Sequence, residues 1–216
     1  MVVFPGGGYY FFWQAGVAAR LRERGELKDK ILLGASAGAL AAVFTACQVD
    51  LGEAARCAER LLEEHGVYSR VGGFVGIWGR IVEAWLATCL PEDAAERCNR
   101  QGVHIIITQA PWTRRIVTEF RDREHLIQAL LASTHVPWVM DGRMCRVFEG
   151  QWCTDGGLFG VPVPGASGGV IDYRQDPELR AGWWEWMRVG VRGRSESLVR
   201  RGYLYAEAQW DAKGDK

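Results

Sequence analysis

The pattern of hydrophobic and polar residues divides the chain into short apolar runs and longer segments with helical spacing. The runs Val2–Phe4 and Ile31–Leu33 are short, apolar and closed by proline or glycine, which predicts buried strands. Residues 51–66 instead repeat apolar positions every three or four residues, which predicts an amphipathic helix closing at Gly66. Because strands and helices alternate, the sequence predicts an α/β fold with a layered sheet.

The same reasoning extends along the rest of the chain. Helices are predicted over residues 9–24, 37–47, 74–90, 122–134 and 196–210, with Asp122 as the N-cap of the fourth. Strands are predicted over 102–110, 115–120 and 169–174, and a hairpin over 143–157 with its turn at Glu149-Gly150. The Pro/Gly-rich stretch 160–169 is the one segment with the composition of a linker. We therefore expect one domain, with residues 1–165 as its core and 166–216 as a C-terminal extension that adds a strand and a terminal helix.

The uncharged run from Ile31 to Val49 has two interpretations. Its length is close to the roughly 20 apolar residues of a membrane-spanning helix, and Gly34 and Gly38 have the spacing that lets such helices pack closely. The same letters read Gly-x-Ser-x-Gly around Ser36, the pattern of a nucleophile elbow. A strand that runs into glycine, followed by a helix of small residues, favours the elbow over the membrane helix.

Composition excludes several classes of protein. The 216 residues include 26 Lys and Arg against 26 Asp and Glu, so no net field favours nucleic acid. The six cysteines show no metal-binding spacing, and the hairpin register places Cys153 opposite Arg146 rather than Cys145, so we expect neither a metal site nor a disulfide there. No cofactor is expected. The N-terminal residues lack a basic segment followed by a long apolar run, so we expect no signal peptide and a cytoplasmic location.

Three consecutive glycines, Gly6, Gly7 and Gly8, separate the first strand from the first helix, and we call them the glycine loop. A Walker loop would end in Gly-Lys-Ser/Thr, and a Rossmann fingerprint counted from Gly6 would need glycine where Phe11 stands, so neither nucleotide motif fits. An oxyanion hole needs only backbone N–H groups aimed at a developing negative charge, and glycines leave room for that approach. A plain turn without chemistry is the alternative for this loop.

A serine nucleophile requires a base, and the chain order of the candidates is informative. In α/β-hydrolases the order is serine, acid and then histidine, but all four histidines precede Asp155: His65, His104, His125 and His135. A carboxylate could instead contact Ser36 directly. Asp155 closes a predicted strand and is followed by Gly156 and Gly157, which leaves its side chain unobstructed at a sheet edge. Asp141 is the rival, and we interpret it as a solvated turn residue.

The elements "GGGYYFFWQAGV", "GASAGAL" and "DGG" occur in the order and approximate spacing of the patatin-like phospholipase family, and the chain resembles the branch that contains adipose triglyceride lipase. The resemblance spans roughly residues 3–165. It implies a three-layer α/β/α fold with a central, mostly parallel sheet and a Ser–Asp dyad that cleaves fatty-acyl esters of lipids. Carried over, Ser36 is the nucleophile, Asp155 accepts its proton and the glycine loop forms the oxyanion hole. Gly34, Gly38, Gly156 and Gly157 complete the elbow and the DGG motif.

Two positions depart from the family pattern: many members have a basic residue and a glycine where this chain has Tyr10 and Phe11. Most of the aromatic run Tyr9–Trp13 is expected in the core, with one face available to an acyl pocket. Trp183, Trp184 and Trp186 suit either a lipid–water interface or packing on the sheet.

The sequence thus predicts a lipid acyl hydrolase acting on acylglycerols or phospholipids. An acyltransferase on the same fold and a catalytically silent lipid-binding protein are the alternatives. The predicted partners are a lipid ester and, through peripheral contact, a membrane or lipid-droplet surface.

Overall fold

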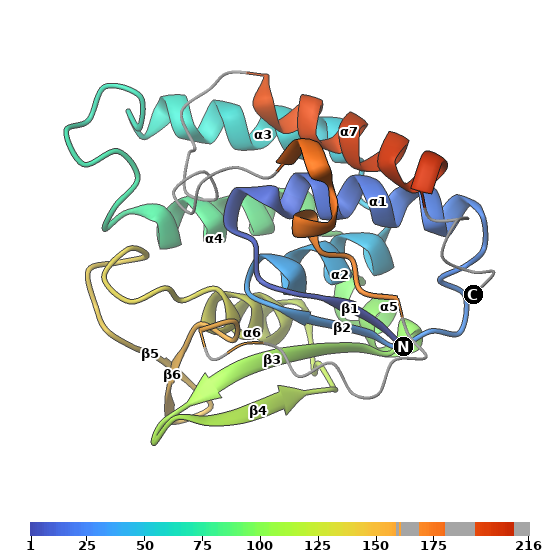
Figure 1. Cartoon of the computed structure of the whole chain (residues 1–216). Coiled ribbons are helices and arrows are strands. Elements are labelled where there is room, and N and C mark those ends of the chain that lie inside the picture. Colours follow the sequence, from blue (N-terminus) through green and yellow to red (C-terminus); the bar gives the residue numbers. More distant parts are fainter. Residues whose placement is uncertain (159, 161–168, 180–192, 210–216) are drawn as a thin grey trace.

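The computed structural model describes residues 1–158, 160, 169–179 and 193–209 (Figure 1). Its sheet has six strands: β1 (Val2–Phe4), β2 (Leu32–Ala35), β3 (Val103–Gln109), β4 (Thr113–Val117), β5 (Arg146–Phe148) and β6 (Gln151–Thr154). Strands β1, β2 and β3 run parallel, β4 and β6 pair antiparallel with β3, and β5 forms a hairpin with β6. Four strands therefore share one direction. The α/β class and the mostly parallel sheet are confirmed.

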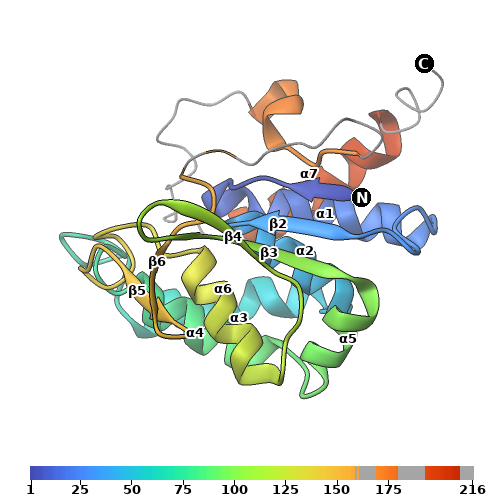
Figure 2. The ribbon, with the colours of Figure 1, turned by 90° about the horizontal axis from the view of Figure 1, so that it is seen from below.

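The described helices are stacked over one face of this sheet in both ribbon views (Figures 1 and 2). A helical layer on the second face, which the expected three-layer α/β/α fold includes, is not seen among the described residues. Helices α2 (Ala37–Cys47), α5 (Ala94–Gln101) and α6 (Arg123–Ser133) contact the strands. Above them lie α1 (Phe11–Glu23, preceded by the 3-10 helix Gly8–Tyr10), α3 (Leu51–Glu64) and α4 (Trp78–Cys89). Helix α7 (Arg194–Gln209) lies outermost, against α1 and α3.

The backbones of helices α7 and α1 are in direct contact at two glycines. A Cβ built on Gly16 would lie 2.1 Å from the carbonyl oxygen of Val199, and one on Gly202 would lie 2.0 Å from that of Trp13. Both distances are far below contact, so any side chain at these two glycines would force the helices apart. The C-terminal helix therefore packs on the core through a glycine-lined seam.

Most predicted elements are observed, and their ends shift by a few residues. The helix expected over 74–90 begins at Trp78, and the strand expected over 115–120 occupies Thr113–Val117. Asp122 caps α6 as expected, because its side chain accepts a hydrogen bond from the His125 N–H at 2.7 Å. The hairpin turn is also confirmed, with Cys153 opposite Arg146.

Two expectations require correction. Helix α5 was not among the predicted helices; its sequence is short and polar, and only Ala94, Ala95 and Cys98 are buried. Residues 169–174 do not form the predicted strand: Val170 makes an isolated bridge with Val3, and the chain then turns into a 3-10 helix at Tyr173–Gln175. The tryptophans at 183, 184 and 186 lie outside the described residues.

The uncharged run 31–49 is broken into a strand, a sharp turn at Ser36 and the 11-residue helix α2. Among the described residues, no helix combines the length and the apolarity needed to cross a bilayer.

Candidate active site

Ser36 occupies a strained turn between β2 and α2. Its backbone angles, φ 54° and ψ −131°, fall in a region that residues with a Cβ rarely adopt. Two glycines allow this turn to sit tightly against its neighbours: a Cβ on Gly34 would lie 2.5 Å from Ala39 Cα, and one on Gly38 would lie 2.0 Å from the Phe4 carbonyl oxygen. The geometry is that of a nucleophile elbow, with Ser36 at the N-terminus of α2 and partly exposed.

The register of the sheet brings Asp155 to the same place. Strand β4 pairs with β3 along Ile105–Gln109, so it occupies one edge of β3. Strands β2 and β6 must therefore share the other edge, where β2 pairs as far as Ile106 and β6 pairs from Thr108. They approach from opposite directions and end head to head beside Ile107. The residue after each strand, Ser36 in one case and Asp155 in the other, thus meets its counterpart at this point.

The carboxyl group of Asp155 is buried, and the residue is 4% exposed. Oδ1 accepts a hydrogen bond from the Gly157 N–H at 2.7 Å, while Oδ2 makes no hydrogen bond to a described residue. Burial raises the pKa of Asp155 to about 6, and the side chain of Ser36 and the Gly157 N–H oppose that rise. Asp155 is therefore a buried carboxyl group with a raised pKa, beside a serine on a strained turn.

Glycines keep the space around this pair open. A Cβ on Gly6 would lie 3.3 Å from Ser36 Cβ, and one on Gly157 would lie 3.6 Å from Ser36 Cβ and 3.1 Å from Asp155 Oδ1. A Cβ on Gly156 would lie 2.0 Å from the Ile106 carbonyl oxygen, so the chain after Asp155 runs directly against β3. The glycine loop thus borders Ser36, as the sequence predicts.

The N–H groups of the glycine loop are available for binding. None of the three donates a hydrogen bond to a described residue, and Gly8 has a left-handed backbone conformation with φ 54°. The loop also leads into the first helical turns, where unpaired N–H groups favour a negative charge.

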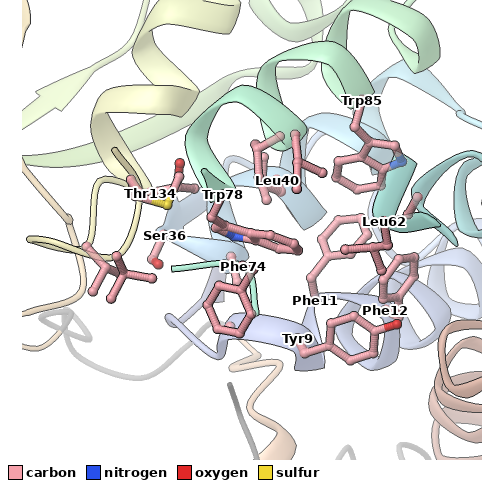
Figure 3. A pocket seen from close by; sticks show the side chains of 18 residues that line it. Tyr9, Phe11, Phe12, Ser36, Leu40, Leu62, Phe74, Trp78, Trp85 and Thr134 are labelled. Carbon is pink, nitrogen blue, oxygen red and sulfur yellow. The ribbon is translucent and has the colours of Figure 1, made fainter. Parts of the chain in front are cut away.

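An apolar pocket opens from Ser36 into the layer of helices (Figure 3). Its walls come from α1, α2, α3 and α4 and from the segment after α6, and they are mainly aliphatic and aromatic side chains. Phe11, Phe12, Leu40, Leu62, Trp78 and Trp85 are among them. All five residues of the aromatic run are buried, which confirms that the run packs in the core. Tyr9, Phe11 and Phe12 also line the pocket, whereas Trp13 does not and donates from its indole N–H to Asp176.

The histidines are engaged elsewhere. His65 bonds to the Leu61 carbonyl, His125 to Glu149, and His135 to the Arg143 carbonyl, while burial lowers the pKa of both His104 and His135. None of the four is hydrogen-bonded to Ser36. Asp141 is exposed and accepts from the Arg143 N–H at 2.9 Å, which is the turn role expected for it. In the described part of the chain, no three His, Cys, Asp or Glu side chains cluster as metal ligands.

Comparison with known proteins decides the family, because residues 2–166 match the sequence model described as patatin-like phospholipase. The chain belongs to the patatin-like phospholipase family.

Two curated relatives match about three quarters of this chain. It is 28% identical to the omega-hydroxyceramide transacylase of Homo sapiens over 173 residues, 74% of this chain and 31% of that protein. It is 30% identical to a 1-acylglycerol-3-phosphate O-acyltransferase of Mus musculus over 169 residues, 74% of this chain and 40% of that protein. The chain thus spans less than half the length of either relative. Among solved structures, VipD from Legionella pneumophila matches with a TM-score of 0.40 and 13% identity, over 76% of this chain and 47% of that one.

Tyr10 and Phe11, the two positions that depart from the patatin-like pattern, both pack against other aromatic rings. Phe11 is buried, and its ring packs edge-on against Phe44 and Trp85 at centroid distances of 5.1 and 5.2 Å. Tyr10 stacks on Tyr173 at 4.2 Å. Phe11 therefore fills part of the pocket wall, and Tyr10 joins the glycine loop to residues beyond the family match.

Ser133 links the segments that form the candidate site, and the sequence did not predict this role. Ser133 is fully buried at the end of α6; its Oγ accepts from the Ser36 N–H at 2.9 Å and donates to the Ile106 carbonyl at 2.7 Å. Its own carbonyl accepts from the Gly156 N–H at 2.9 Å. Ser133 thus ties the strained elbow, β3 and the segment after Asp155 together. Its only sequence signal was a polar residue closing an apolar helix.

We predict that Ser133→Ala lowers kcat roughly 10–100-fold with little change in KM, because a displacement of about 1 Å at the reacting group costs on that order. The measurement is hydrolysis of a soluble ester by folded protein. Thr45→Val is the matched control: it also removes a buried hydroxyl that bonds a carbonyl, that of Ala41, but near the far end of α2. Unchanged kcat in a folded Ser133→Ala variant would contradict the prediction.

Proposed function

We propose that this chain is a lipid acyl hydrolase, with Ser36 as nucleophile and Asp155 as proton acceptor. The observation that carries the proposal is that Ser36 belongs to two features at once. It sits on the strained turn that meets buried Asp155, and it forms part of the wall of the apolar pocket. A nucleophile at the end of an apolar channel is the arrangement that an ester with a fatty-acyl chain requires.

The proposed reaction proceeds in two halves. The Ser36 hydroxyl attacks the ester carbonyl carbon while its proton passes to Asp155, and the N–H groups of the glycine loop stabilise the oxyanion. The tetrahedral intermediate then collapses, and the leaving alcohol takes the proton from Asp155. In the second half Asp155 removes a proton from water, which attacks the acyl-enzyme. The fatty acid leaves, and Ser36 recovers its proton.

The raised pKa of Asp155 suits this role. A carboxylate with its ordinary pKa near 4 is a weak base, whereas a pKa of about 6 makes proton transfer from serine less unfavourable. The group is still mainly ionised at pH 7–8, so the reactive form remains the populated one.

The apolar pocket predicts a dependence on acyl-chain length. Each buried methylene contributes about 0.8 kcal/mol, or roughly fourfold, so the six methylenes between acetate and octanoate should raise kcat/KM for p-nitrophenyl esters by up to about 4 × 10³-fold. Trp152→Ala should leave this series unchanged, because Trp152, on β6, is 59% exposed and does not line the pocket. A flat series would contradict an acyl-binding role for the pocket.

Acyl transfer is the second candidate, and the names of the two relatives favour it: one is a transacylase and the other an acyltransferase. In that reaction an alcohol or lysolipid replaces water as the second acceptor. The two functions are separated by supplying a glycerolipid ester together with a monoacylglycerol or lysophospholipid acceptor and measuring free fatty acid against acylated acceptor. A product dominated by acylated acceptor would reassign the chain from hydrolase to transferase.

Contact with a lipid surface is part of the same proposal. The loops before α4 and after α6 both line the pocket, and they are joined by a hydrogen bond from Gly76 N–H to the Val139 carbonyl at 2.8 Å. They also carry exposed apolar side chains, among them Val71, Val75 and Trp138. We therefore expect peripheral binding at a membrane or lipid droplet; the cytoplasmic location stays a prediction.

A further inference from the structure

Residues beyond the family match lie against the glycine loop. The match ends at residue 166, yet Gly169 and Ile171 flank Val3 through backbone hydrogen bonds of 3.0 and 2.9 Å. Gln14, buried in α1, donates to the carbonyl of Pro5 at 2.8 Å and to that of Ile171 at 3.0 Å. The C-terminal segment is therefore fastened beside the chain that enters the loop.

The ring of Tyr173 extends this contact onto the loop itself. A Cβ on Gly7 would lie 3.2 Å from Cδ1 and 3.3 Å from Cε1 of Tyr173, so the ring packs on the backbone of the central glycine. The other side of the contact is Tyr10, whose ring stacks on Tyr173 with an interplanar angle of 16°. Tyr173 therefore contacts both the glycine loop and the helical turn that follows it.

Helix α7 supports the same region from further along the chain. The Arg194 guanidinium lies 5.4 Å from the ring centre of Tyr9 and 5.8 Å from that of Tyr10. The Tyr9 hydroxyl is hydrogen-bonded to Ser195 Oγ at 2.5 Å. These residues hold Tyr9 and Tyr10 in place, and Tyr173 stacks on the second of them.

We propose that Tyr173 is a positioning residue that holds the glycine loop in its oxyanion-binding conformation. Three consecutive glycines have more conformational freedom than any other tripeptide, and their N–H groups are held by no described residue. A rigid aromatic ring packed on Gly7 restricts that freedom without occupying the N–H groups. The inference rests on the proposed function, because it assigns the loop its role in stabilising the oxyanion.

The test compares kcat and KM for a soluble p-nitrophenyl ester, together with the rate of labelling by a fluorophosphonate. Tyr173→Leu should lower kcat and the labelling rate roughly 10–100-fold with KM within about twofold, as expected for a misplaced oxyanion donor. Tyr173→Phe should match wild type, since the Tyr173 hydroxyl makes no hydrogen bond to a described residue. Tyr203→Leu is the matched control, because Tyr203 is also a C-terminal tyrosine, but it lies on α7 and contacts Arg20 and Glu23 at the other end of α1 from the glycine loop.

Gly7→Ala, alone and combined with Tyr173→Leu, tests whether Tyr173 acts on the glycine loop directly or only attaches the C-terminal segment to the core. Gly7→Ala places a methyl group against the Tyr173 ring and should lower kcat. Combining it with Tyr173→Leu should cost less than the product of the two single effects, because the smaller side chain makes room.

The inference is overturned if folded Tyr173→Leu keeps wild-type kcat, if Tyr203→Leu loses as much kcat, or if the Gly7 and Tyr173 effects simply multiply. Failure of the proposed function would look different, since wild-type protein would then show neither ester turnover nor labelling of Ser36.

Discussion

Asp155→Asn is expected to lower ester turnover roughly 10²–10⁴-fold, the range over which general bases contribute, while leaving the fold intact. The amide keeps the shape of the carboxyl group, and its oxygen can still accept the Gly157 N–H, but it cannot take a proton from Ser36. The measurement is hydrolysis of a soluble ester per folded molecule. Asp141→Asn is the control, because Asp141 is an exposed turn residue, and it should keep most of the activity.

The same substitution is expected to raise stability at neutral pH. Burial raises the pKa of Asp155 to about 6 in the folded protein, whereas the unfolded value is near 4. Above pH 6 the group is ionised in both states, and the folded state carries the full cost, roughly 3 kcal/mol at about 1.4 per pKa unit. Below pH 4 it is neutral in both states, and the cost disappears.

Asp155→Asn should therefore unfold at a higher temperature than wild type at pH 7–8, and the difference should shrink between pH 6 and pH 4. Thermal melts across this range measure it. A variant that is less stable than wild type at pH 8, or a difference independent of pH, would mean that burial of the ionised Asp155 carboxylate does not destabilise the folded protein.

Ser36→Ala is expected to reduce turnover by about 10⁴–10⁶-fold, the scale seen when a catalytic serine is removed. It should also abolish labelling by a fluorophosphonate, which reacts only with an activated nucleophile. Because alanine at a φ of 54° is strained in the same way as serine, the fold should be kept. Intact-protein mass spectrometry of wild type and variant after labelling gives the result. Full labelling of the folded alanine variant would assign the chemistry to another serine.

The sequence predicted the site where its signals are local. The strand, glycine and small-residue helix around Ser36 lie within a few residues of each other, so the elbow is encoded in one short stretch. The sequence signals for the proposed base are less local. Asp155 was favoured by chain order, by its two following glycines and by family resemblance, but its meeting with Ser36 depends on β2 and β6 ending head to head on one edge of β3. That register involves residues more than 100 positions apart.

Other features were hidden from the sequence for physical reasons. Ser133 acts through three hydrogen bonds to distant segments, which no spacing pattern records. The raised pKa of Asp155 depends on burial by the complete fold. Residues 169–174 have strand composition, but only Val170 reaches a strand partner, since the chain then turns toward the glycine loop. In each case tertiary contacts, rather than local preference, determine the outcome.

The central claim is that the base for Ser36 is Asp155 and not a histidine. The most direct test is the pH dependence of the fluorophosphonate acylation rate, measured for wild type, Asp155→Asn and the individual glutamine variants of His104, His125 and His135. We predict that the wild-type rate falls as the pH drops through about 6, that every folded histidine variant keeps this decline, and that Asp155→Asn retains only a slow residual rate without it. Loss of the decline in a histidine variant, with Asp155→Asn still reacting at the wild-type rate, would contradict the Ser–Asp assignment.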